Sequence, residues 1–226
     1  YYPPAIRGTL PNSNVMELPK KIAEHYVDIG EREEARKRAI WAVDYYKGIL
    51  DNFPKVPLTM MATRLLAEMY SATGEYQLAV NMLQTVVDST GRIFDPARSM
   101  IADLYLTRLN RAPEALVIYN DIINDGQDSL AIATAYIKLA TLDFGDSRYQ
   151  DGRNQLEKLR QRFPGLANVQ AQAQMLKARS FDDEKNNERA RQEYVALLNE
   201  FPNSIQALEV LAYMPEYFQR IGQPGL

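Results

Sequence analysis

Apolar residues recur along most of the chain at steps of three and four positions, which is the spacing of one face of an α-helix. Five of these stretches share an alanine at an equivalent point, with a larger residue just before it and usually an aromatic ring three positions after it. The alanines are Ala23, Ala67, Ala102, Ala140 and Ala178. The larger residue and the ring share one helical face, beside a small residue where a neighbouring helix can approach closely. The pattern predicts five similar packed helices.

A second apolar ladder follows each of these helices. It opens twelve or thirteen residues past the alanine with another small residue, which is Ala35, Ala79, Ala115, Gly152 or Ala190. Short polar or glycine-containing segments such as Thr73-Gly74-Glu75 separate the two ladders. In repeats four and five the second ladder is followed by a proline, Pro164 or Pro202, where a helix could not continue. The chain is therefore expected to form five helical hairpins.

A helix–turn–helix unit of about 34 residues with these positions resembles the tetratricopeptide repeat. Pro164 and Pro202 fall at the family's terminal proline, and Tyr76 and Tyr149 fall at its inter-helix aromatic position. The resemblance covers residues 16–204 and implies an all-α fold, a right-handed α-solenoid of about five helical hairpins with a C-terminal capping helix. The expected segments are an extended proline-rich leader at 1–15, repeats at 16–59, 60–94, 95–132, 133–170 and 171–204, and the capping helix and tail at 205–226.

Departures from the repeat predict where individual hairpins differ. The chain spans 44 residues from Tyr26 to Tyr70, and its apolar phase continues through this stretch, so the second helix of repeat one is expected to be about two turns longer than usual. Repeat three has one extra residue before Ala115, which should lengthen only a turn. In repeat two the ladder Ala79, Leu83, Val86 and Thr90 places Thr90 in the second helix.

The pattern begins a sixth first helix near Leu208, but Pro215 stands where the aromatic residue belongs. We therefore expect a capping helix over residues 205–221 that is kinked or broken at Pro215. Four of its apolar residues, Tyr213, Met214, Tyr217 and Phe218, exceed what a solvated cap needs. They either fold back onto repeat five or form a contact for a partner.

Composition and charge narrow the choice of partner. The 226 residues carry 26 basic and 29 acidic side chains, a net charge of -3 that does not attract phosphate backbones. Nucleic acid is therefore not an expected partner. No run of 18 apolar residues occurs, so no membrane span is expected. The proline-rich leader is either a linker from an upstream lipid or membrane anchor or a coil lying on the first helix.

Residues for catalysis, a metal or a cofactor do not form a recognisable set. The chain has no cysteine. Its single histidine, His25, has no partner at metal-ligand spacing and is expected to be a structural or surface residue. Asp143-Phe144-Gly145 imitates a kinase motif at a repeat turn, and the acidic cluster 182–184 lacks the pattern of a calcium loop. We therefore expect no enzyme activity and no cofactor, metal or catalytic site.

Function is then expected to come from shape. Successive first helices of such a stack line a concave groove, and positions near the repeat alanine face it. The predicted partner-binding residues are Lys20, Glu24, Arg64, Glu68, Ser71, Ser99, Asp103, Ile137, Thr141, Phe144, Met175 and Arg179. The apolar end of this set lies around Ile137, Phe144 and Met175, and charged pairs such as Arg64 and Glu68 lie toward the N-terminus.

The mixed charges favour an extended or helical peptide as the partner. The chaperone-binding members of the family hold a terminal carboxylate with basic and amide side chains, and the acidic residues Glu24, Glu68 and Asp103 would repel such a group. The alternative reading of Arg64 and Glu68 is an ordinary surface pair four positions apart on one helix.

The sequence therefore predicts a non-catalytic scaffold or adaptor that binds a protein or peptide in its groove. The alternatives are a regulatory or substrate-positioning module of a larger enzyme, and a scaffold that self-assembles through its cap; the oligomeric state stays open. Phe201-Pro202-Asn203-Ser204 with Ala207 resembles junctions common in repeat proteins of the bacterial envelope. That resemblance implies a periplasmic or outer-membrane-associated location and a role in envelope assembly, with the cytoplasm as the alternative.

Overall fold

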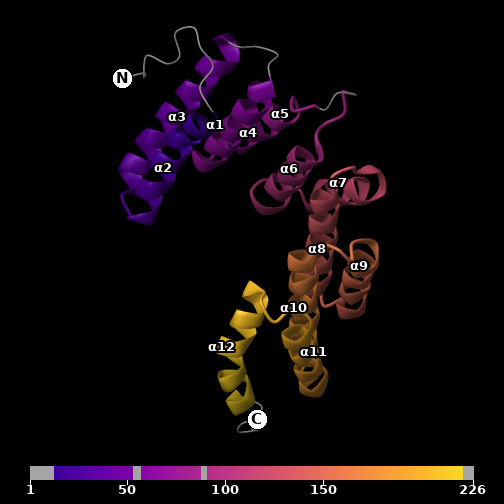
Figure 1. Ribbon diagram of the computed structural model, residues 1–226. Helices are drawn as coiled ribbons and strands as arrows, with labels where there is room; N and C mark the ends of the chain where they lie inside the picture. Colours follow the sequence, from indigo (N-terminus) through magenta and orange to yellow (C-terminus); the bar gives the residue numbers. More distant parts are fainter. Residues whose placement is uncertain (1–12, 53–56, 88–90, 221–226) are drawn as a thin grey trace. The chain divides into compact units, whose positions relative to one another are not determined.

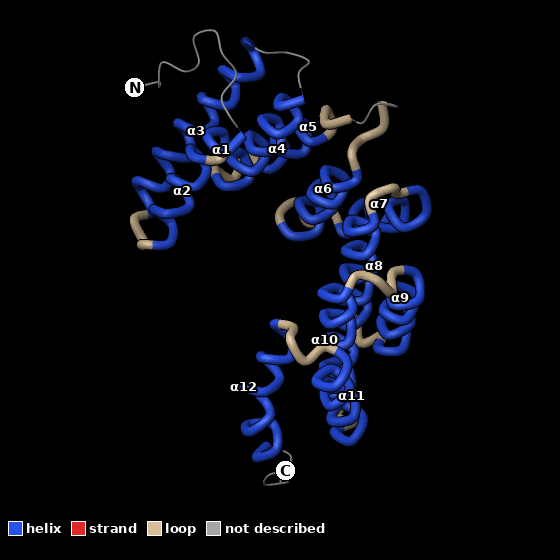
Figure 2. Tube along the Cα trace, in the orientation of Figure 1, coloured by secondary structure: helices blue, strands red, loops and turns tan. Residues whose placement is uncertain are grey.

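The computed structural model describes residues 13–52, 57–87 and 91–220, with the side chains of 13, 14, 57–59 and 214–220 left aside. The chain divides into two compact units, residues 1–118 and 119–226, which are described separately. Figure 1 follows the helices in chain order, and Figure 2 shows the short turns that join them. Apart from an isolated antiparallel bridge between Val87 and Ile93, every named element in the described residues is a helix. The predicted all-α repeat fold is confirmed.

The helices alternate in hairpins along both units. The first unit contains α1 (Ser13–Met16), α2 (Leu18–Asp28), α3 (Arg32–Asn52), α4 (Pro57–Ala72), α5 (Tyr76–Leu83), α6 (Asp95–Thr107) and the start of α7 (Ala112–Asp125). The second unit contains the rest of α7, followed by α8 (Ser129–Gly145), α9 (Tyr149–Arg162), α10 (Ala167–Asp183), α11 (Asn187–Glu200) and α12 (Ile205–Arg220). The first helices α8 and α10 begin four residues before the expected starts of their repeats, at 133 and 171.

Small residues sit where the helices pack most closely. All five first-helix alanines are 4% exposed or less, and the five small residues of the second helices are buried as well. At Gly152 in α9, an added Cβ would lie 2.9 Å from the carbonyl oxygen of Ala140 in α8 and would overlap the Phe144 ring. This is why glycine replaces alanine in repeat four.

The turns inside the five hairpins share one backbone design. Each contains a residue with positive φ, which is Gly30, Gly74, Asn110, Ser147 or Lys185. The next N–H donates to the carbonyl at the aromatic position of the first helix over 2.7 to 2.9 Å, as Glu75 does to Tyr70. This bond satisfies a carbonyl that the helix end leaves without a partner. Four of the turns have three residues and the α6–α7 turn has four, which confirms the predicted extra residue.

The second helix of repeat one is longer than those of the later repeats, as predicted. Helix α3 has 21 residues, against 14 in α9 and α11. Its added length buries Tyr46, whose hydroxyl donates to the carbonyl of Met16 over 2.7 Å. Met16, the first residue of the predicted repeat one, is itself fully buried, so the chain is anchored on α3 at this point.

The end of the predicted extended leader is helical. Residues 13–15 of that leader form the helix α1 together with Met16, whose carbonyl accepts the hydrogen bond from Tyr46. Pro19 lies in the first turn of α2, where proline is well tolerated. Residues 1–12 of the predicted leader lie outside the described residues, as do Phe53 and Pro54.

The second helix of repeat two is shorter than its apolar ladder predicts. Helix α5 ends at Leu83, and Val86 is buried but follows the helix. The hydroxyl of Thr85 donates to the carbonyl of Met82, and the N–H of Phe94 donates to the carbonyl of Val86. Placing Val86 in the helix was therefore wrong, because β-branched residues here pair with the segment before α6 instead. Thr90 lies outside the described residues.

The capping helix α12 runs from Ile205 to Arg220, so the helix is not broken at Pro215, and the alternative of a kink there stays a prediction. A proline inside a helix removes a single backbone donor, and the ladder can continue on both sides of it. Tyr213 folds back onto repeat five, where its ring lies 5.9 Å from that of Tyr194 and its hydroxyl donates to Asp182 over 2.9 Å. The side chains of Met214, Tyr217 and Phe218 lie outside the described set.

The opposite face of α12 is apolar and open. Ile205, Leu208 and Leu211 are 57% to 71% exposed. Ala212, which corresponds to the buried alanine of the earlier repeats, is exposed as well. This face is where the second helix of a sixth repeat would pack.

We predict that Gly152→Ala lowers the free energy of unfolding of the second unit by about 1–3 kcal/mol, because the new methyl group meets the α8 backbone. Chemical denaturation followed by circular dichroism measures the change. Gly145→Ala is the matched control, since no neighbour lies within 4 Å of its added Cβ. Equal stability of the two variants would contradict the close approach of α8 and α9.

Gly74→Ala and Gly48→Ala should change the stability of the first unit in opposite directions. Neither added Cβ meets an atom within 4 Å, but Gly74 has φ +85° and Gly48 lies in the interior of α3. Gly74→Ala should cost about 1 kcal/mol of unfolding free energy, whereas Gly48→Ala should gain about 0.5–1 kcal/mol. Denaturation followed by the fluorescence of Trp41, the single tryptophan, reports on this unit. A gain for Gly74→Ala would refute the turn geometry.

Candidate partner-binding groove

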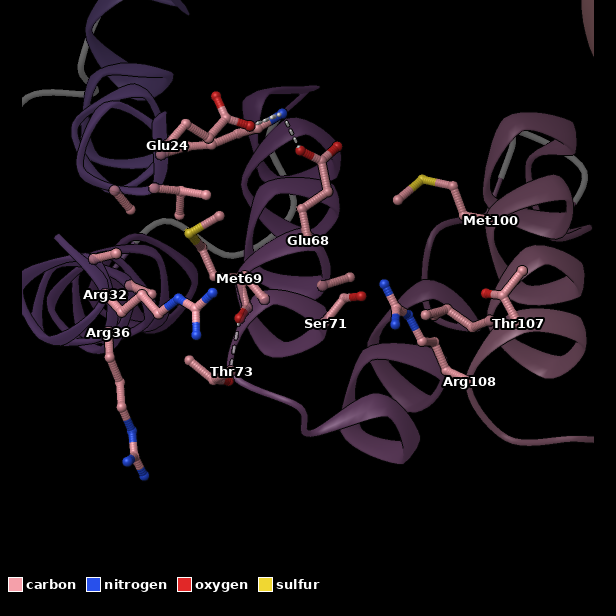
Figure 3. A pocket seen from close by; sticks show the side chains of 18 of the residues that line it. Glu24, Arg32, Arg36, Glu68, Met69, Ser71, Thr73, Met100, Thr107 and Arg108 are labelled. Carbon is pink, nitrogen blue, oxygen red and sulfur yellow. Dashed lines mark hydrogen bonds and ion pairs between the residues drawn. The ribbon is translucent and has the colours of Figure 1, made fainter. Parts of the chain in front are cut away.

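A groove with a volume of about 840 Å³ opens on the first unit. The first helices α2, α4 and α6 line it, together with α3 and residues of the hairpin turns (Figure 3). Five of the predicted partner-binding residues come together here: Lys20, Glu24, Glu68, Ser71 and Asp103. Their contact with a partner stays a prediction, but the structure places them around one shared space.

The floor of the groove is apolar because the repeat needs small residues there. Ala23, Ala35 and Ala67 are packing positions of the hairpins and also line the groove. Ala39, Met69 and Leu104 extend this floor and are buried as well. Methyl groups in place of larger side chains leave room above the helices, so the packing that forms the hairpins also hollows the surface.

An ion-pair cluster stands at one end of the groove. The Lys20 ammonium of α2 lies 2.5 Å from one carboxylate oxygen of Glu68 in α4 and 3.5 Å from Glu24. Arg64 approaches the other oxygen of Glu68 at 3.5 Å. Glu68 is therefore not only the partner of Arg64 on its own helix, because it also ties α4 to α2. Arg64 itself does not line the groove.

The surroundings of Lys20 keep its ammonium charged. Burial alone would lower the pKa of Lys20, but the hydrogen bond and the negative charge of Glu68, with a smaller effect of Glu24, outweigh burial and raise it above the ordinary value. The charged pair is thus stable across the neutral range, and it offsets negative charge that would otherwise face the groove.

The other end of the groove is basic. Arg32 and Arg36 from α3 and Arg108 from the α6–α7 turn line this end. Figure 3 shows the guanidinium groups of Arg32 and Arg108 pointing into the space from opposite sides. Among the described residues none of the three pairs with a carboxylate; Arg108 lies 5.7 Å from the centre of the Tyr76 ring. These arginines were not among the predicted residues, because Arg32 and Arg36 lie on a second helix and Arg108 lies in a turn.

Ser99, like Arg64, is a predicted residue of the first unit that lies outside the groove. Ser99 is on α6 but does not line the groove. Its hydroxyl is buried without a hydrogen-bond partner in the part of the chain that the structure describes. The residue as a whole is partly exposed, and its part in partner binding stays a prediction.

The predicted residues of the second unit are mostly engaged in packing. Ile137 and Met175 are 8% and 5% exposed, respectively. Phe144 covers Gly152 and stacks against Tyr149, with ring centres 6.5 Å apart. The apolar end expected around Ile137, Phe144 and Met175 therefore presents little surface, because these side chains complete the hairpin cores.

Two predicted positions of the second unit are exposed, namely Thr141 and Arg179. The Thr141 hydroxyl donates to the carbonyl of Ile137 over 2.8 Å, and Arg179 lies 3.4 Å from Glu209 of α12. Their part in partner binding stays a prediction.

The residues of the motifs that imitate catalytic or metal sites make contacts with neighbouring side chains of the repeats. His25 is exposed in α2, with its ring edge near Tyr26. Asp143 ends α8 by pairing with Arg148, and Glu184 pairs with Arg153 of the preceding repeat. The described residues contain no group of three or more histidines or carboxylates placed to hold a metal ion. None of the described helices has the length and apolar character needed to cross a membrane.

We predict that Lys20→Met lowers the unfolding free energy of the first unit by about 1 kcal/mol at pH 8 and by less at pH 11.5. Because the pKa of Lys20 is higher in the folded than in the unfolded chain, its contribution is complete below about pH 10 and is lost as the pH rises through the folded value. Urea denaturation at both pH values measures the gap from wild type.

Lys21→Met is the control for this experiment. Lys21 pairs with Glu17 in an exposed position on the same helix, so its removal should leave only a small gap at either pH. A gap for Lys20→Met that does not shrink at high pH would show that the ion pair is not its source.

Solved structures with known folds resemble this chain. Alignment with MamA gives a TM-score of 0.51 at 17% identity and covers 76% of this chain and 94% of MamA. Alignment with a tetratricopeptide repeat protein from Parabacteroides merdae gives a TM-score of 0.57 at 16% identity and covers 93% and 75% of the two chains. At these identities the likeness concerns the fold alone. None of the curated proteins compared with the chain matches it in sequence.

The sequence itself carries the family signature in both units. The tetratricopeptide repeat family matches residues 20–90, which contain most of α2 and all of α3 to α5. It also matches residues 137–205, which contain the second half of α8 and all of α9 to α11. The two matched segments together make up more than half of the chain. Five hairpins with buried small residues at equivalent points agree with this match, and the chain therefore belongs to the tetratricopeptide repeat family.

Proposed function

We propose that the chain is a non-catalytic adaptor that binds a segment of another protein in the groove of its first unit. Tetratricopeptide repeats generally mediate interactions between proteins. The observation that carries the proposal is the groove itself, a space of about 840 Å³ with an apolar floor and charged edges formed by three successive first helices. Its volume falls within the range of sites that hold ligands.

In this proposal the floor of the groove supplies binding energy, and its edges determine how the bound segment is oriented. Burial of apolar side chains against Ala67, Met69 and Leu104 supplies most of the binding energy. The charged edges set the orientation of the bound segment. Ordering a flexible segment offsets part of this gain, so we expect micromolar affinity, about -8 kcal/mol.

The proposal concerns binding and leaves the cellular setting as a prediction. A periplasmic or outer-membrane-associated location, with a role in envelope assembly, rests on the junction around Phe201 and Pro202 in the sequence. A partner segment bound in the groove is compatible with that setting and with others.

We predict that Ser71→Trp abolishes binding of segments selected by the groove, because an indole on α4 would occupy the space above the floor. Ser71 lines the groove and is only partly buried, so the fold should tolerate the change. The test selects twelve-residue peptides from a random display library on the whole chain and measures their affinities by fluorescence anisotropy.

The matched control is Asp44→Trp. Asp44 is exposed on α3 and does not line the groove, so the added ring leaves the space open. Binding should weaken at least about tenfold for Ser71→Trp and stay unchanged for Asp44→Trp. Peptides that bind Ser71→Trp as tightly as wild type would place the site elsewhere, and failure to select any peptide would also refute the proposal.

A further inference from the structure

We propose that the segment bound in the groove is acidic, and that Arg32, Arg36 and Arg108 bind its aspartate and glutamate side chains. This inference rests on the function proposed above and assigns the chemistry of the partner. It follows from the distribution of charge around the groove and from the direction in which the arginines point.

Two of the three acidic residues that line the groove, Glu24 and Glu68, have cationic partners within the chain. Lys20 lies within ion-pair distance of both Glu24 and Glu68, and Arg64 adds a second cation beside Glu68. Asp103 also interacts within the chain. These are the acidic residues among those that line the groove. A bound segment therefore meets few carboxylates that lack compensation.

The positive charges at the other end have no such partners. Arg32 and Arg36 lie one helical turn apart on α3, and both line the groove. The guanidinium group of Arg32 points into the space, whereas that of Arg36 points away from it and lies at the margin of the groove (Figure 3). Neither forms an ion pair with any residue that the structure describes, and both are exposed. Three cations around one space repel each other, and anions from a partner would relieve that repulsion.

The geometry suits carboxylates on side chains. Arg32 and Arg108 face each other across the space, with Ser71 of α4 between them (Figure 3). A guanidinium group presents parallel N–H donors that match the two oxygens of a carboxylate. An extended or helical segment lying between α3 and α6 can therefore offer one acidic side chain to each wall.

The rest of the groove argues against a uniform polyanion. The apolar floor of alanine, methionine and leucine needs apolar side chains to cover it, and nucleic acid phosphates would leave it exposed to water. The occupant that fits is a protein segment with acidic residues at one end and apolar residues along the floor.

The experiment uses peptides selected by display on the whole wild-type chain. We expect them to contain aspartate or glutamate beside apolar residues, and replacing these acids by asparagine or glutamine should weaken binding at least about fivefold. The variant Arg32→Gln/Arg36→Gln should lose a similar factor for the acidic peptides, and should show no further loss for the amide versions. Affinity for the acidic peptides should also fall as salt rises.

Lys21→Gln/Lys37→Gln is the matched control variant. It removes two positive charges from α2 and α3, but both lysines are exposed and lie outside the groove. It should bind every peptide as wild type does. A loss equal to that of the arginine variant would show that only the overall charge matters, and would overturn the inference.

The outcomes separate this inference from the proposed function. If Ser71→Trp blocks binding but neither the amide peptides nor Arg32→Gln/Arg36→Gln changes the affinity, the groove binds a segment and the acidic assignment is wrong. If Ser71→Trp blocks nothing, the proposed function itself fails. A labelled twelve-nucleotide single strand that bound wild type and lost binding to Arg32→Gln/Arg36→Gln would also overturn the assignment, because the arginines would then bind phosphates.

Discussion

The close approach of paired helices at small residues is the constraint on which the rest of this structure depends. Each hairpin buries one small residue from its first helix and one from its second, and at Gly152 even a single methyl group would meet the opposing backbone. Closely packed helices can be stacked in series without voids. The same residues form the floor of the groove, since Ala23, Ala35 and Ala67 take part in both. The groove is thus a consequence of the packing rule.

The turns show why this packing recurs with so little variation. The carbonyl at the aromatic position of each first helix accepts the N–H that follows the residue with positive φ, so the ring that packs the hairpin and the bond that closes it belong to one residue. Tyr70 illustrates the link, because its ring is buried and its carbonyl accepts from Glu75. Where the residue is Asp143, its side chain pairs with Arg148 and supports the same turn.

The sequence predicted those features that depend on local spacing. The buried alanines, the extra residue of the α6–α7 turn and the long α3 all follow from counting positions between equivalent residues. The end of α5 could not be found in this way, because Val86 keeps the helical phase while its backbone pairs with Phe94. The continuous α12 was missed because Pro215 was judged by its residue type, and a helix can tolerate the loss of one donor.

The candidate site was only partly predictable for a related reason. Positions near the repeat alanine identified Lys20, Glu68 and Asp103, because the groove runs along first helices. Spacing alone gave no sign that Lys20 reaches across to Glu68, since that ion pair joins two repeats. It also gave no sign of Arg32 and Arg36, which lie on a second helix and enter the groove only because α3 packs beside α2.

In the function proposed here, recognition of a partner depends on residues whose identity the packing of the repeat does not fix. The floor must stay small and apolar for the hairpins to pack, so it can distinguish partners only by shape. Residues at the ends of the turns do not have to be small and apolar. Arg108 lies in the one described hairpin turn that is a residue longer than the others. The extra residue thus lies in the same turn as a cation that faces the groove. A departure from the repeat that costs little in packing is where a partner-specific charge can be placed.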